Sequence, residues 1–333
     1  MRSVTRAVCS VYLASHWRGA CLPFITRAES GFGDWLVIKG VLLFVVIGIA
    51  ALALRPLGGV ASRVLLQPPA PLEDRGKVTM LVLGIDRRTT EPTRTDTMLL
   101  ARVGPAGQAT EVLSIPRDLW VAIPGHGEDR INTAFVWGGL ANGDGAGLAR
   151  RTVEETFGVQ VDRVMVVDFA CFQEAVDAVG GVSVNVPQRL VDDSYPMADG
   201  GTTTIAFEPG AQRLSGERAL EYVRTREADN DFGRIGRQQQ VVAAVAARLA
   251  DPGAAMRMTT LWIGGCGHSG TDLSPTDVAA LGRLAVAGGQ PHFATVGLDM
   301  VVPTTLASGA EVLMPRWDRI RPLVAQTFGN ARG

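Results

Sequence analysis

The sequence has few of the residues from which metal, redox and nucleophilic sites are usually built. No two cysteines form a CxxC pair, and no histidine stands at metal-ligand spacing, which argues against a zinc site or a dithiol redox motif. The cysteines are Cys9, Cys21, Cys171 and Cys266. Ser-His-Asp and Cys-His sets are not apparent either, because His126, His268 and His292 fall in unrelated loops.

Cys171 and Cys266 allow two interpretations. They can form a disulfide if they lie outside the cytoplasm, but sequence does not show whether their backbones come close enough. Free cysteine behaves as a small apolar residue and is among the most buried types. The sequence therefore favours two buried, unbonded side chains.

The chain also lacks an excess of charge of either sign. It has 333 residues, 47% of them apolar, with 32 Lys and Arg against 33 Asp and Glu and a formal net charge of −1. This composition excludes a disordered chain and a bulk nucleic-acid-binding protein. No internal repeat or low-complexity tract is apparent, and the chain is long enough for one large core or two modest ones.

One long apolar run is present. LVIKGVLLFVVIGIAALAL, residues Leu36 to Leu54, contains a single charge, Lys39. Its 19 residues would span roughly 28 Å as a helix, close to the thickness of a bilayer core. The alternative is a cleaved signal peptide, but the run is longer than a usual signal core and only a weak cleavage site follows it.

The sequence therefore predicts a single transmembrane helix. Basic residues are more numerous before it than after it, which places the N-terminus in the cytoplasm and the rest of the chain outside the cell. The predicted organisation is a cytoplasmic tail over residues 1–35, a transmembrane helix over 36–54, a Pro-rich spacer over 55–77 and one extracytoplasmic domain over 78–333.

Within the outer domain, strand and helix patterns alternate, which favours an α/β sandwich. Helices are expected in CFQEAVDAVGG, where glycines close the helix, and over residues 146–157, 215–223 and about 232–250. Strands are expected at 78–86, 97–103 and 111–115, the last two as a hairpin, and around Val166 and Val184.

Acidic and basic residues follow these strands closely. Asp86 closes the first strand and Asp96 precedes the second, so the two carboxylates can converge on a Mg²⁺ ion. The structural alternatives are that Asp96 caps a turn and that Asp86 pairs with a neighbouring arginine. Arg117 follows Pro116 at the carboxyl end of a strand, where open α/β sheets tend to bind ligands. A salt bridge to Asp118 or Asp86 is its structural alternative, and Arg130 in DRIN is a weaker candidate.

The densest cluster is YVRTREADNDFGRIGRQQQ, residues 222–240. Arg224 and Arg226 fall at the end of one helix, and Asp231 is a candidate N-cap of the next. Arg234, Arg237 and Gln238 share a face of its first two turns, and helix N-termini with guanidinium groups bind phosphates. With few aromatics nearby, a phosphorylated ligand is favoured over nucleic acid and over a solvated face.

Seven motifs in this order resemble the LytR-CpsA-Psr family of cell-wall ligases. They are LGIDRR, TRTDTM, SIPRDLWV, RIN, DFACFQEAVDAVGGVSVNVP, LSGERALEYVRTR and DFGRIGRQQQ. The resemblance covers nearly the whole outer domain. It implies a mixed central sheet sandwiched between helices, with an apolar tunnel for a polyprenyl chain.

The resemblance also implies a membrane-anchored phosphotransferase. Such an enzyme moves a glycopolymer from a polyprenyl-pyrophosphate carrier to peptidoglycan through a phosphodiester. Asp86 and Asp96 would hold Mg²⁺, or Mn²⁺ in its place, and Arg94 and Arg117 would act catalytically. The pyrophosphate would be bound by Arg94, Arg117, Arg130, Arg224, Arg226, Arg234 and Gln238.

Two questions stay open from sequence. Asp118 and Asp231 are both candidates for the general base, although each also suits a structural role. A lipid-carrier pyrophosphatase and a non-catalytic regulatory or carrier-binding protein are the alternative functions. The abundance of Ala, Gly, Val and Arg points to a GC-rich genome, such as that of an actinobacterium, but it does not identify the glycan.

Overall fold

The computed structural model describes residues 77–86, 93–104, 108–197, 200–225, 231–266 and 271–329. They belong to one compact unit, Ser62–Gly333. The predicted tail, the transmembrane helix and nearly all of the Pro-rich spacer lie outside the described residues. Within the described part, no helix combines the length and the apolar character needed to cross a bilayer.

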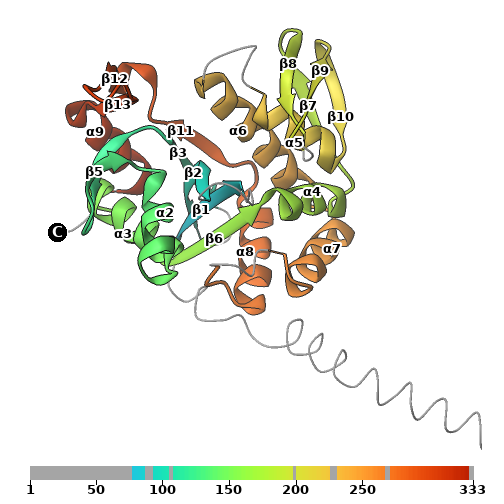
Figure 1. Ribbon diagram of the computed structural model, residues 1–333. Helices are drawn as coiled ribbons and strands as arrows, with labels where there is room; N and C mark the ends of the chain where they lie inside the picture. Colours follow the sequence, from blue (N-terminus) through green and yellow to red (C-terminus); the bar gives the residue numbers. More distant parts are fainter. Residues whose placement is uncertain are drawn as a thin grey trace, which may run out of the picture. The chain divides into compact units, whose positions relative to one another are not determined.

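A five-stranded mixed sheet forms the centre of the unit, with the order β11-β3-β2-β1-β6 (Figure 1). The hairpin predicted from the sequence is present, since β2 pairs antiparallel with β3 as well as with β1. The outer strands β6 and β11 run parallel to β1 and β3, respectively. The strands are β1 Val78–Asp86, β2 Arg94–Val103, β3 Glu111–Ile115, β6 Arg163–Asp168 and β11 His292–Thr295.

Helices cover both faces of this sheet, which confirms the predicted mixed sheet between helices. Alternate residues of β1 point to opposite faces: Leu81 and Leu83 pack in a core with Leu148 of α3, whereas Val82 packs toward Leu281 of α8 and Val242 of α6. The helices of the first face are α2 Thr133–Asn142, α3 Gly145–Phe157 and α9 Trp317–Phe328. Those of the second are α4 Phe169–Ala178, α6 Asp231–Arg248, α7 Pro252–Ile263 and α8 Pro275–Gly288.

A second core lies beside the central sheet, where two antiparallel strand pairs pack on helices α4, α5 and α6 (Figure 1). The strand predicted around Val184 belongs here, because it pairs with β10 and not with the central sheet. The elements are β7 Val182–Val186, β8 Leu190–Pro196, β9 Thr202–Phe207, β10 Gly210–Leu214 and α5 Gly216–Arg224. The glycines predicted to end α4 do so: Gly180 and Gly181 both have φ of 81°, which favours glycine.

Two small hairpins complete the described elements. They pack together, since Leu119 forms a β-bridge with Leu313 and the Leu313 amide donates to the Asp118 carbonyl over 2.9 Å. The segments are β4 Trp120–Ile123 and β5 Gly127–Arg130, and η1 Leu298–Met300, β12 Val301–Thr305 and β13 Glu311–Pro315. The C-terminal hairpin thus supports the loop that follows β3.

The prediction that Cys171 and Cys266 are unbonded is wrong. The two residues form a disulfide, with their Cα atoms 5.1 Å apart and a sequence separation of 95. Both are buried, as the sequence suggested, but α4 and the end of α7 bring them close enough to bond. Sequence could not show this proximity.

Candidate functional site

A β-bulge places Asp96 near the start of β2, the middle strand of the central sheet. Gly84 of β1 pairs with Thr97, and the next residue, Ile85, pairs with Thr95. The pairing register therefore skips Asp96, and such bulges re-aim side chains next to active sites. The Asp96 carboxylate accepts a hydrogen bond of 2.6 Å from Arg117 Nη1.

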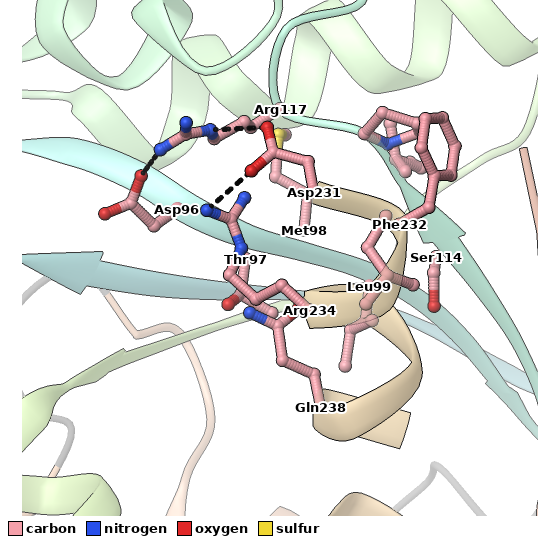
Figure 2. A pocket seen from close by; sticks show the side chains of 13 residues that line it. Asp96, Thr97, Met98, Leu99, Ser114, Arg117, Asp231, Phe232, Arg234 and Gln238 are labelled. Atoms are coloured by element: carbon pink, nitrogen blue, oxygen red, sulfur yellow. Dashed lines mark hydrogen bonds and ion pairs between the residues drawn. The ribbon is translucent and has the colours of Figure 1, made fainter. Parts of the chain in front are cut away.

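Arg117 lies at the centre of the site, immediately after β3 and Pro116. Its Nε atom is 3.3 Å from Asp118 Oδ2 and 3.5 Å from Asp231 Oδ2, so its guanidinium contacts three carboxylates. Figure 2 shows two of them, Asp96 and Asp231. Burial alone would lower the pKa of Arg117, but the three neighbouring acids raise it above its ordinary value. Arg117 is therefore a permanent cation in a ring of negative charge.

The loop that carries Arg117 is fixed by main-chain bonds from the RIN motif. The amide of Asn132 donates to the Arg117 carbonyl at 3.2 Å, and the amide of Ile131 donates to the Leu119 carbonyl at 2.8 Å. Thr95 of β2 in turn donates to the Asn132 carbonyl. The motif thus holds the arginine loop against the bulged strand.

Asp118 links Arg117 to Arg130, whose Nε atom is 3.6 Å from Asp118 Oδ1. Burial raises the pKa of Asp118, and a hydrogen bond with Asp231 raises it further, whereas Arg117 and Arg130 oppose the rise. Burial and a second carboxylate both favour the protonated form of a carboxyl, so Asp118 accepts a proton more readily than an isolated aspartate does. Arg130 is oriented by the Glu311 carbonyl, which accepts from its Nε and Nη2 atoms.

The first two turns of α6 complete the site. Asp231 is the first residue of the helix, one position later than the N-cap predicted for it. Its Oδ1 atom is 2.9 Å from Arg234 Nη1, while its Oδ2 atom faces Arg117. Figure 2 shows Asp231 between the two arginines, with Gln238 one turn further along α6.

These side chains enclose a cavity of about 10 Å³, which is close to the space of one water molecule. Its polar lining is Asp96, Ser114, Arg117, Asp231, Arg234 and Gln238. Its apolar lining includes Met98, Leu99, Phe232 and Ile235. Because the carboxylates occupy the positions around the guanidinium groups, an anionic ligand would bind by replacing them as the arginines' partners.

A second part of the site lies at the carboxyl end of β1. Asp86 Oδ2 is 3.9 Å from Arg224 Nη2, at the C-terminus of α5. No group of three or more potential metal ligands occurs among the described residues. In general, Mg²⁺ can be held by one or two carboxylates and take its remaining ligands from water and substrate phosphates. Asp86 and Asp96 are the residues that would hold it.

Arg237 does not face this site, although it shares a helix face with Arg234. Its guanidinium is buried and donates to the carbonyls of Tyr222 at 2.8 Å and Thr225 at 2.6 Å. It thereby donates to carbonyl groups at the C-terminal end of α5, where the last turn of a helix needs donors from outside. Arg237 shapes the turn between the two helices.

The structure thus brings most of the predicted residues together. One network contains Asp96, Arg117, Asp118, Arg130, Asp231 and Arg234. Gln238 lines the same cavity. Arg94 is exposed at the start of β2 and pairs through its backbone with Asp86, and Arg226 lies outside the described residues.

Sequence reasoning missed several residues that support this network. Phe169 and Tyr195 stack on Arg224, and Gln239 donates to the hydroxyls of Ser114 and Thr295 at 2.8 Å each. Phe169 follows Asp168 in the motif DFACFQEAVDAVGGVSVNVP. This motif was the one signal in the sequence that could have pointed to Phe169. Tyr195 belongs to a hairpin with no motif of its own.

Curated relatives share about half of the chain. Over 174 residues it is 38% identical to the polyisoprenyl-teichoic acid–peptidoglycan teichoic acid transferase TagU of Oceanobacillus iheyensis, covering 52% of this chain and 51% of that one. TagT of Bacillus subtilis is 36% identical over 179 residues, covering 52% and 53%. The regulatory protein MsrR of Staphylococcus aureus is 31% identical over 175 residues, covering 52% and 49%. The chain therefore spans about half the length of the curated relatives it matches.

Solved structures show the same fold over a longer stretch. TagT bound to LIIa-WTA superposes with a TM-score of 0.61 and 26% identity, covering 80% of this chain and 95% of that one. Bacillus subtilis TagV gives 0.60 at 23% identity, covering 75% and 96%, which supports the fold alone. The family model LytR_cpsA_psr matches residues 60–288, a stretch that holds all the arginines and carboxylates of the site. Since this match covers more than half of the chain, the protein belongs to the LytR-CpsA-Psr family.

Proposed function

We propose that this chain transfers a glycopolymer from a polyprenyl-pyrophosphate carrier to peptidoglycan. The observation that carries the proposal is the contact of Arg117 with three carboxylates beside Arg234 at the N-terminus of α6. Guanidinium forks and a helix N-terminus bind phosphate oxygens well. The transferase names of the TagU and TagT relatives support the same substrate class.

In the proposed reaction an acceptor hydroxyl of peptidoglycan attacks the phosphorus that bears the glycan. A new phosphorus–oxygen bond forms, the bond to the bridging oxygen breaks, and polyprenyl phosphate leaves with the electron pair. Arg117 and Arg234 stabilise charge on the phosphoryl oxygens, which is the main requirement of phosphoryl transfer. The proton of the hydroxyl passes to the Asp118–Asp231 pair.

A bound Mg²⁺, held by Asp86 and Asp96, would neutralise charge on the pyrophosphate. Manganese is an equivalent candidate. Arg224 lies beside Asp86 and would contact the same pyrophosphate. Arg94 is close in sequence to Asp96, and Arg226 is close in sequence to Arg224, so we place both at this end of the site. Gln238 would donate an amide hydrogen bond to the ligand in the cavity.

A lipid chain suits the second face of the central sheet. Several apolar side chains there are only partly buried between β1, β6 and β11 and the helices α6 and α8. They are Val82, Met165, Val167, Val242 and Phe293. Apolar surface that is incompletely covered can accept a polyprenyl chain, and we propose this face for it.

We further propose that the domain lies outside the cytoplasm, anchored by the apolar run at residues 36–54. The disulfide supports this location, because disulfides persist in oxidising compartments. Such a location would place the site near a carrier that resides in the membrane.

The test is transfer of radiolabelled sugar phosphate from a synthetic polyprenyl-pyrophosphate glycan to peptidoglycan, with Mg²⁺ present. We expect Arg117→Ala and Asp96→Ala to lower the rate by about 100-fold or more, the usual cost of one charge-stabilising group. Arg189→Ala is the matched control, because Arg189 is exposed and pairs with Glu208 far from the network. Normal transfer by both site variants would show that the site is wrongly assigned.

The alternatives give different products in the same assay. A carrier pyrophosphatase would release polyprenyl phosphate with water as the only acceptor. A regulatory protein, as the name of the MsrR relative suggests, would bind the carrier without forming either product. Either outcome would contradict the ligase proposal.

A further inference from the structure

Arg224 is held between two aromatic rings. Its guanidinium carbon lies 4.3 Å from the centroid of Phe169 on α4 and 5.2 Å from that of Tyr195 on β8. Its Nη1 atom also donates to the Tyr195 hydroxyl at 3.1 Å. Such contacts fix a long side chain that would otherwise occupy many rotamers.

The geometry of this stack leaves part of the guanidinium available. The N–H donors of a guanidinium lie in the plane of the group and point outward. Nη1 faces the Tyr195 hydroxyl, while Nη2 lies 3.9 Å from Asp86 at the end of β1. Burial raises the pKa of Tyr195, although Arg224 opposes the rise, so the hydroxyl stays neutral and accepts the hydrogen bond.

The same hairpin holds the next residue as well. Asp192 of β8 is buried and accepts a hydrogen bond of 2.7 Å from the Thr225 hydroxyl. From the other side, Arg237 donates to the Thr225 carbonyl. The segment that carries Arg224 is therefore fixed by β8 and by α6 together.

We propose that Phe169 and Tyr195 are positioning residues that aim Arg224 at the ligand's pyrophosphate group. The proposal rests on the function proposed above and assigns a role to the β8–β9 hairpin, which carries none of the predicted site residues. The rings reduce the freedom of Arg224 before a ligand arrives, so that less entropy is lost on binding.

The test measures binding of inorganic pyrophosphate, with Mg²⁺, to the full-length chain by calorimetry. We expect Phe169→Leu and Tyr195→Leu each to weaken binding by about threefold to tenfold, the range for a cation–π contact. Tyr195→Phe keeps the ring and loses one hydrogen bond, so it should retain most of the affinity. Phe169→Tyr also keeps the aromatic ring and should bind with wild-type affinity.

A double-mutant cycle separates positioning from general loss of structure. In an Arg224→Ala background, the Phe169→Leu and Tyr195→Leu changes should weaken binding no further, because they act through Arg224. Arg218→Met is the matched control. Arg218 stacks on Phe207 of the same hairpin at 4.1 Å, and its polar partners are Glu221 and the Ala206 carbonyl. Its loss should lower thermal stability and leave affinity unchanged.

Full affinity in both leucine variants would overturn the positioning role. The role would also be overturned if the leucine changes weakened binding equally in the wild-type and Arg224→Ala backgrounds. The proposed function would still stand if Arg117→Ala weakened binding in the same experiment. If the wild-type chain bound no pyrophosphate, the proposed function and the positioning role would fall together.

Discussion

At the residue scale, two arginines of α6 differ in role because they bond to different kinds of partner. Arg234 and Arg237 are three residues apart and are each 4% exposed. Arg234 contacts the Asp231 carboxylate, which a phosphate group could replace, whereas Arg237 donates to main-chain carbonyls that no ligand replaces. We therefore assign Arg234 to ligand binding and Arg237 to the fold.

Arg237→Met should destabilise the protein strongly. The substitution leaves the buried carbonyls of Tyr222 and Thr225 without their donor, and loss of such a network costs about 3 kcal/mol. Urea unfolding followed by circular dichroism would measure the change. Arg319→Met removes an exposed arginine 3.9 Å from Asp299 and should cost less than about 0.5 kcal/mol. Equal effects of the two changes would contradict the assignment.

Asp118→Asn should alter how stability depends on pH. The raised pKa of Asp118 means that the native state holds a proton which the unfolded state releases. Wild-type stability should therefore fall, relative to the variant, as pH rises from the ordinary value of 3.8 through the raised pKa. Unfolding free energies of both proteins, measured across that interval, would show the relative slope. A constant difference would contradict the raised pKa.

At the scale of elements, the bulge between β1 and β2 connects strand pairing to the site. A Cβ atom added at Gly84 would lie 2.9 Å from the Thr97 side chain, closer than real contacts allow. The bulge follows at once and presents Asp96. Glycine at position 84 therefore allows the two strands to approach where the carboxylate must be placed.

Gly84→Ala should lower stability by about 1–3 kcal/mol, as overpacking usually does, and should weaken pyrophosphate binding by displacing Asp96. Gly282→Ala is the matched control on α8, because a Cβ atom there would meet nothing within 4 Å. It should leave binding unchanged and raise helix stability by up to about 1 kcal/mol. Calorimetric binding and thermal unfolding of both variants would decide; unchanged binding in Gly84→Ala would contradict the link.

At the scale of the whole molecule, distant segments converge on the site. The C-terminal hairpin lies outside the family match, yet the carbonyl of its Glu311 orients Arg130 from 181 residues away. The disulfide joins α4, which carries Phe169, to the end of α7. Cross-links of long loops stabilise mainly by restricting the unfolded chain.

The Cys171→Ala, Cys266→Ala double variant should lose about 2–4 kcal/mol of unfolding free energy. A reducing agent should destabilise the wild type by a similar amount and leave the double variant unaffected. Because neither cysteine contacts the arginine network, pyrophosphate affinity at 25 °C should be preserved. A loss of affinity without a loss of stability would contradict a purely structural role.

Much of the fold was determined by the sequence itself. Strand β1 and helices α3, α5 and α6 follow from apolar patterns, caps and glycines, which are local signals. Ordered motifs also identified the family, because each keeps its chemistry within a few residues. Arg117, Arg130 and Arg234 could therefore be named as candidate ligand contacts before their neighbours were known.

Only the tertiary structure decided which distant groups meet. Tyr195 reaches Arg224 across 29 residues, and Cys171 reaches Cys266 across 95. The bulge at Asp96 depends on the register between two strands, and the separate roles of Arg234 and Arg237 depend on what packs against one helix face. Sequence specifies these contacts only through packing of the whole chain, because no local pattern encodes the distance between remote segments.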